Sequence, residues 1–171
     1  MKTLVIGLGN PILTDDGVGI YASRLVKYAL PDDTDIDVIE CSIGGLSLME
    51  AMIGYERVIL IDAIWQPNTP IGQMFQFDAG NLPETLNTAS AHDADLPTAV
   101  NVGRELGAIL PELEDIHIVA IQIDDTLTFG EDPTPPVAAA IPLAATSALK
   151  LLGIEEEKPF PPYRQLVSNF A

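Results

Sequence analysis

Cysteine and basic residues are scarce in this chain, and each shortage excludes classes of protein. The 171 residues include a single cysteine, Cys41, so an internal disulfide and a cysteine-rich zinc site are both excluded. Eight lysines and arginines stand against 25 aspartates and glutamates, which gives a net charge of −17. Nucleic-acid binding depends on Lys and Arg that neutralise phosphates, and anionic lipid surfaces repel an acidic protein, so neither partner is expected. A cationic peptide or a metal ion is favoured instead.

Long hydrophobic runs and targeting segments are also missing. No apolar run approaches the roughly 18 residues needed to span a bilayer, and Met1-Lys2 leads directly into the first predicted strand without a signal peptide. Apolar residues make up 47% of the chain, which is typical of an ordered globular protein. We therefore expect a cytoplasmic protein with one domain and a sizeable core.

Short β-branched runs alternate with helical patterns along the chain. Strands are predicted at residues 3–6, 36–40, 57–63, 72–77 and 116–121, and helices at residues 16–29, 46–53, 97–110 and 137–151. Alternating strands and helices form βαβ units, so we predict a three-layer α/β fold with a twisted, mostly parallel sheet of about five strands and helices on both faces. This domain covers residues 1–152, and the Pro-rich residues 153–171 are predicted to form a flexible tail.

Two helical patterns carry more specific expectations. The third helix is predicted to bury Ala99, Val100, Gly103, Leu106 and Leu110. In the last helix, Pro142 lies inside the pattern and predicts a kink or a late start.

Residues 6–19, with the sequence IGLGNPILTDDGVG, organise the chain. Gly7 and Gly9 allow a sharp turn directly after the first strand. Asp15 and Asp16 follow at the start of a helix, where the helix dipole favours carboxylates and where one of the two is expected to cap the helix. Because ligands bind at the carboxyl ends of strands in open α/β sheets, this turn is the first candidate for a functional site.

Acidic residues also end the next two strands. Asp16, Glu40 and Asp62 follow the first, second and third strands, and parallel strands bring them to one edge of the sheet. His92 lies on a polar loop that can fold over this edge. Two carboxylates and an imidazole can hold a divalent metal and leave positions open for a substrate group. Taken singly, each residue is more often a cap or a solvated side chain, while mid-strand His117 and Cys41 are more often structural.

The stretch Gly7–Gly19 resembles the opening signature of the hydrogenase maturation endopeptidases. The strand end Ile61-Asp62-Ala63 and the loop Ser90-Ala91-His92 fall at the spacing of that family, and residues 120–137 resemble its C-terminal segment. The resemblance covers about residues 1–152. The first motif is quite specific, and the others are convincing mainly by their order and spacing.

The resemblance implies an enzyme that removes a C-terminal extension from the large-subunit precursor of an [NiFe]-hydrogenase after nickel insertion. It implies a metal-contacting set of Asp16, Asp62 and His92, with the nickel carried by the substrate and no organic cofactor. The second-strand acid, commonly Asp followed by Gly-Gly in this family, is here Glu40, and Gly44-Gly45 follow only after three further residues. We therefore expect Glu40 to be catalytic, although the motif around it differs from the pattern of the family.

Three other interpretations remain open on the sequence. Gly-Leu-Gly-Asn-Pro also opens the peptidyl-tRNA hydrolases, but those enzymes continue into a basic segment and act on RNA, which an acidic chain disfavours. A generic Rossmann nucleotide-binding domain is a second alternative, although the third glycine of its fingerprint is absent and there is no Walker motif. The third is a non-catalytic accessory protein that senses nickel or binds hydrogenase with the same site.

Overall fold

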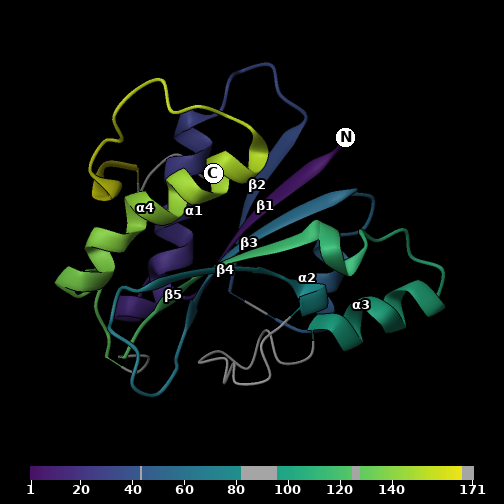
Figure 1. Ribbon diagram of the computed structural model, residues 1–171, viewed down its shortest axis with the longest axis horizontal. Helices are drawn as coiled ribbons and strands as arrows, with labels where there is room; N and C mark the ends of the chain where they lie inside the picture. Colours follow the sequence, from purple (N-terminus) through teal and green to yellow (C-terminus); the bar gives the residue numbers. More distant parts are fainter. Residues whose placement is uncertain (43, 82–95, 125–127, 167–171) are drawn as a thin grey trace.

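The computed structural model describes residues 1–42, 44–81, 96–124 and 128–166 (Figure 1). The strands are β1 (Thr3–Leu8), β2 (Ile36–Cys41), β3 (Arg57–Ile64), β4 (Met74–Asp78) and β5 (Ile116–Gln122). The helices are α1 (Val18–Ala29), α2 (Leu46–Ala51), α3 (Leu96–Glu105) and α4 (Pro135–Leu152), with short 3₁₀ turns η1 (Thr14–Gly17), η2 (Ala79–Asn81), η3 (Leu113–Asp115) and η4 (Tyr163–Leu166).

The five strands form one sheet in the order β2-β1-β3-β5-β4. Four of them are parallel, and β4 pairs with β5 in the antiparallel direction at the edge. The predicted mostly parallel sheet, with residues 72–77 at its edge, is therefore confirmed. The parallel strands β1, β2, β3 and β5 end at one side of the sheet, which we call the carboxyl edge.

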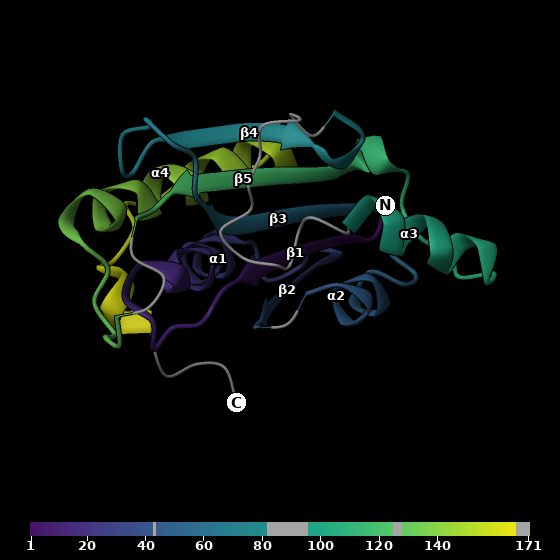
Figure 2. The same cartoon turned by 90° about the horizontal axis from the view of Figure 1, so that it is seen from below.

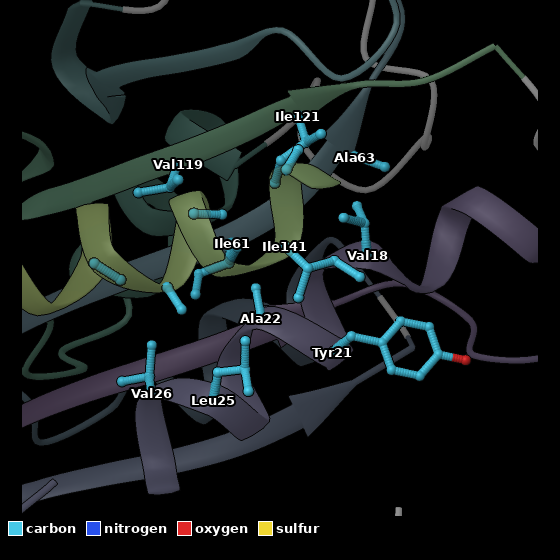
Figure 3. Packing of buried hydrophobic residues seen from close by; sticks show 14 of the residues in the cluster. Val18, Tyr21, Ala22, Leu25, Val26, Ile61, Ala63, Val119, Ile121 and Ile141 are labelled. Carbon is cyan, nitrogen blue, oxygen red and sulfur yellow. The ribbon is translucent and has the colours of Figure 1, made fainter. Parts of the chain in front are cut away.

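Helices cover both faces of the sheet, as predicted. Helices α1 and α4 lie together on one face, and α2 and α3 lie on the other (Figures 1 and 2). Each face has its own hydrophobic cluster, and Figure 3 shows the first, in which Leu25, Ile61 and Ile141 meet from α1, β3 and α4. Among the described residues, α4 is the one helix long and apolar enough to cross a membrane, but its packing against α1 and the sheet identifies it as a core helix.

Glycine allows α1 to approach the sheet closely. A Cβ atom on Gly19 would lie 2.1 Å from the carbonyl oxygen of Ile61 and 2.3 Å from that of Leu8. A Cβ atom on Gly7 would lie 2.2 Å from the Ser23 hydroxyl. The first turn of α1 is therefore seated directly on the ends of β1 and β3, which fixes the segment before it against the carboxyl edge.

Two core expectations need correction. The helical pattern predicts a buried Leu106, but this residue is 82% exposed because α3 ends at Glu105 and the chain turns away through Gly107 at φ 90°. Helix α4 does not start late, since it runs from Pro135 through Pro142 to Leu152. Pro135 occupies the first turn, where the ring fits the helix and no amide partner is lost.

The segment after α4 packs more firmly than its composition indicates. The sequence predicts a flexible tail from residue 153, but Ile154, Phe160, Tyr163 and Leu166 contact the cluster beneath α1 and α4. The Tyr163 ring lies 5.2 Å from the Tyr21 ring of α1. The described part of this segment is therefore attached to the folded body.

His117 on β5 makes folding stability depend on pH. Partial burial lowers the pKa of His117 below its usual 6.5, and nearby Arg57 lowers it further, while Asp115 and Asp78 oppose the shift. Below pH 6.5 the unfolded chain therefore binds a proton at this residue more readily than the folded chain does, so stability falls as the pH falls.

We expect the variant His117→Gln to lose this dependence. The difference in unfolding free energy between wild type and variant should change as the pH falls below about 6.5, with a slope of at most about 1.4 kcal/mol per pH unit. Urea unfolding at several pH values measures it. A difference that is constant across this range, or that favours the wild type at lower pH, would contradict the assignment.

Candidate functional site

The turn after β1, residues 9–17, is called the signature loop here and is built by backbone constraints. Gly9 adopts φ 128°, which a side chain disfavours, and its N–H donates to the carbonyl of Cys41 at the end of β2. The Asn10 side-chain oxygen accepts from the N–H of Ile12, and the Asn10 carbonyl accepts from the N–H of Leu13. Asn10 thus closes a compact turn in the manner usual for asparagine.

Asp16 is held by the start of the same loop. Its Oδ2 atom accepts a hydrogen bond of 2.7 Å from the backbone N–H of Asn10. The side chain is half-buried, and within the described part of the chain this N–H is the one donor to its carboxylate. The contact orients the Asp16 carboxylate within the signature loop.

Asp62 lies at the same edge, within β3. The side chain is fully buried, and its Oδ1 atom accepts from the N–H of Ala63 at 2.8 Å. The η1 turn that carries Asp16 packs against β3. The structure therefore brings the Asp16 turn and the Asp62 strand together, as the parallel topology predicted.

His92 lies outside the described residues, so the third predicted metal contact stays a prediction. Within residues 1–42, 44–81, 96–124 and 128–166 no group of three His, Cys, Asp or Glu side chains is close enough to hold a metal by itself. Two carboxylates oriented by backbone amides, completed by an imidazole, fit a borderline divalent ion such as nickel. The metal-contacting set of Asp16, Asp62 and His92 therefore stays a prediction.

Asp15 has a different part from the one expected from sequence. The sequence predicts that one of the two aspartates caps the following helix, but neither η1 nor α1 has a side-chain cap. Asp15 is almost fully buried and accepts from the N–H of Thr134 at 2.6 Å and from its hydroxyl at 2.9 Å. Thr134 precedes the first turn of α4. Asp15 therefore ties the signature loop to the start of α4.

A second set of contacts joins the signature loop to residues 128–134, which we call the α4 leader. The N–H of Thr14 donates to the carbonyl of Gly130 at 2.7 Å, and the N–H of Gly130 donates to the carbonyl of Ile12 at 3.0 Å. The Thr14 hydroxyl donates to the carbonyl of Thr128. The Tyr21 hydroxyl, which points away from the aliphatic cluster in Figure 3, donates to the carbonyls of Pro11 and Glu131, one from each segment. The two segments are therefore fastened together as one unit.

Glu40 forms a buried ion pair. Its two carboxylate oxygens accept from Nε and Nη2 of Arg24 on α1, at 2.7 and 2.8 Å, and the Arg24 and Glu40 side chains are only 9% and 22% exposed. The neighbouring Cys41 is partly buried and packs against the second cluster. The predicted catalytic part of Glu40 stays a prediction, and the geometry gives this residue a structural part that the sequence did not indicate.

We expect Glu40→Ala to destabilise the fold by about 2–3 kcal/mol, because it leaves the buried Arg24 guanidinium without its carboxylate. The double variant Arg24→Met/Glu40→Leu should recover much of that loss. Asp132→Ala, which breaks the 2.7 Å pair with Arg164 on the surface, is the matched control and should cost less than about 1 kcal/mol. Denaturant unfolding measures all three, and equal costs for the buried and exposed pairs would contradict this assignment.

Several residues that shape the site escaped the sequence analysis. Thr134 and Tyr21 act through partners more than 100 positions away, so no local pattern marks them. Asn10 had a detectable signal, since Asn-Pro directly after a glycine is typical of a turn. A pocket of about 320 Å³ also opens beside the signature loop, with Ile12, Tyr21, Arg24 and Asp132 among its lining residues. It does not include Asp16 or Asp62.

Comparison with known proteins gives consistent results. The family model described as HycI, hydrogenase maturation protease, matches residues 19–151. The hydrogenase 2 maturation protease of Escherichia coli is 26% identical over 161 residues, which covers 91% of this chain and 94% of the relative. The solved structure of the hydrogenase maturating endopeptidase HybD from E. coli is 26% identical, with a TM-score of 0.71 and coverage of 90% and 93%. HybD from Thermococcus kodakarensis shares the fold at 24% identity and a TM-score of 0.70, covering 88% and 99%.

Proposed function

The chain belongs to the hydrogenase maturation protease family and is a peptidase, and from this premise we propose that it removes the C-terminal extension from an [NiFe]-hydrogenase large-subunit precursor after nickel insertion. The observation that carries the proposal is the meeting of the Asp16 turn and the Asp62 strand at the carboxyl edge. The substrate is a cytoplasmic protein precursor, and no nucleic acid or membrane is involved.

In this proposal nickel belongs to the substrate. Asp16, Asp62 and His92 contact the ion in the loaded precursor, and this contact makes cleavage conditional on metal insertion. Each of the two aspartates accepts a hydrogen bond from a backbone N–H, so its carboxylate is already oriented, which reduces the ordering cost of binding. A divalent ion beside the scissile peptide polarises a carbonyl or activates water, so recognition and chemistry can share one site.

The test is incubation of the protein with nickel-loaded and nickel-free precursor, followed by mass spectrometry of both. The proposal predicts that only the loaded precursor becomes shorter, by the mass of a C-terminal peptide. A protein that binds the loaded precursor and leaves its mass unchanged is a non-catalytic accessory protein, and this result would refute the proposal. Shortening of both forms would refute the dependence on nickel.

A further inference from the structure

The described residues after α4, 153–166, return to the candidate site, and we call them the strap. The η4 turn of the strap packs against α1, and Figure 2 shows this turn (yellow) next to the chain before α4 (green). The Arg164 guanidinium of the strap lies 2.7 Å from the Asp132 carboxylate of the α4 leader. The pocket of about 320 Å³ is lined by residues of all three segments, among them Pro11, Glu131 and Arg164. The strap, the signature loop and the α4 leader therefore meet at one place.

Tyr21 on α1 is the side chain that contacts all three segments. It is only 4% exposed, and its hydroxyl oxygen lies 3.1 Å from the carbonyl oxygen of Pro11 and 2.7 Å from that of Glu131. The Tyr163 ring of the strap lies 5.2 Å from the Tyr21 ring at an interplanar angle of 53°, a tilted arrangement that favours aromatic pairs. Burial raises the pKa of Tyr21 above its usual 10, so the hydroxyl keeps the proton that it donates.

A short path leads from Tyr21 to the Asp16 carboxylate. Gly17 follows Asp16 directly, and a Cβ atom on Gly17 would lie 3.0 Å from Cε2 of Tyr21 and 2.9 Å from Cα of Pro11. The N–H of Asn10, the residue before Pro11, donates to Oδ2 of Asp16. The Tyr21 ring and the Pro11 backbone therefore hold both the chain and the hydrogen-bond donor that orient Asp16.

We propose that Tyr21 and Tyr163 are positioning residues for the candidate site: the strap seats the Tyr163 ring against Tyr21, and Tyr21 holds the signature loop where the Asp16 carboxylate acts. This inference rests on the proposed function for the substrate and for the part of Asp16. Both tyrosines act through the signature loop, and a misplacement of about 1 Å at a reacting group can reduce a rate by about 100-fold.

The test compares Tyr21→Phe, Tyr163→Ala and the double variant. Tyr21→Phe keeps the ring against Gly17 and removes the hydroxyl, while Tyr163→Ala removes the ring that supports Tyr21. The first control is Tyr163→Phe, which keeps that ring. The second is Tyr55→Phe, because the Tyr55 hydroxyl donates to Asp37 at 2.7 Å and Tyr55 precedes β3, at the opposite end of the sheet from the carboxyl edge. The kcat is measured with nickel-loaded precursor, and thermal unfolding checks that each variant is folded.

We expect Tyr21→Phe to lower kcat by at least about tenfold and Tyr163→Ala by at least about fivefold, with both controls within about twofold of wild type. Because Tyr163 acts through Tyr21, adding Tyr163→Ala to Tyr21→Phe should lower kcat by less than about a further twofold. Wild-type kcat in the two folded single variants would overturn the inference. So would losses that multiply in the double variant, or a low kcat in Tyr163→Phe.

Amide hydrogen exchange separates this inference from the proposed function, since it needs no substrate. The N–H groups of Thr14 and Gly130 donate between the signature loop and the α4 leader. In Tyr21→Phe and Tyr163→Ala these two amides should exchange at least about fivefold faster than in wild type and in both controls. If wild type leaves the loaded precursor uncut, the proposed function fails while faster exchange still supports the positioning of the loop. Unchanged exchange in both variants would overturn the positioning itself.

Discussion

Asp62→Asn and Asp16→Asn should each reduce processing of nickel-loaded precursor by at least about 100-fold. Asn has the shape of Asp, so the hydrogen bonds from Ala63 to residue 62 and from Asn10 to residue 16 can be kept through the side-chain carbonyl oxygen. The negative charge and one strong oxygen ligand are lost, and both are needed for contact with a divalent ion. Timed samples analysed by mass spectrometry give the rate.

The matched control is Asp33→Asn, which changes an exposed aspartate between α1 and β2. This substitution removes the same charge from the chain, so it accounts for the general effect of net charge on substrate association. We expect it to retain the wild-type rate within about twofold. Near-normal processing by both Asp16→Asn and Asp62→Asn, in variants that unfold at the wild-type temperature, would exclude these carboxylates from the reaction.

Gly19→Ala should strongly destabilise the fold. Its Cβ atom would overlap backbone oxygens of Ile61 and Leu8, which belong to the central strands and cannot rotate away as a side chain can. Helix α1 must shift off the sheet, and we expect a loss of more than about 3 kcal/mol, which corresponds to roughly 10 °C in the unfolding temperature for a chain of this size. Calorimetry measures the shift.

Gly153→Ala provides the comparison for the backbone cost alone. Gly153 ends α4 in the left-handed conformation, with φ 72°, and a methyl group added there would meet no described atom within 4 Å. We expect alanine at this position to lower the free energy of unfolding by about 1 kcal/mol. If Gly19→Ala costs no more than Gly153→Ala, the close seating of α1 on the strand ends is not required for stability.

The sheet was predictable because each of its strands has a strong local signal. Four consecutive apolar residues at 58–61 indicate a strand buried on both faces, and the alternation at residues 72–77 indicates an edge strand, which is how β3 and β4 are placed. The placement of Asp16 and Asp62 at one edge follows from parallel topology alone. Local sequence pattern and parallel topology together therefore predict the strands and the sheet edge at which the candidate site lies.

Contacts between distant segments were not predictable in the same way. Asp15 and Asp16 are chemically identical neighbours, yet Asp15 is buried against Thr134 while Asp16 stays half-exposed, and the difference depends on where α4 begins in space. Arg24, the partner of Glu40, is a charged residue in a helix, and such residues are usually solvated. Its burial depends on the elements that pack around α1. The prediction for Leu106 is wrong because α3 ends at Glu105, so the helical periodicity no longer applies at residue 106.

Asp16, Asp62 and His92 are proposed to contact a single ion carried by the substrate, and a crystal structure of the protein in complex with nickel-loaded precursor, with anomalous data at the nickel edge, tests this most directly. The account predicts one nickel peak at about 2.0–2.2 Å from an oxygen of Asp16, an oxygen of Asp62 and a ring nitrogen of His92. Electron density that places the His92 ring and the two carboxylates on separate surfaces, with no position within coordination distance of all three, would contradict the account.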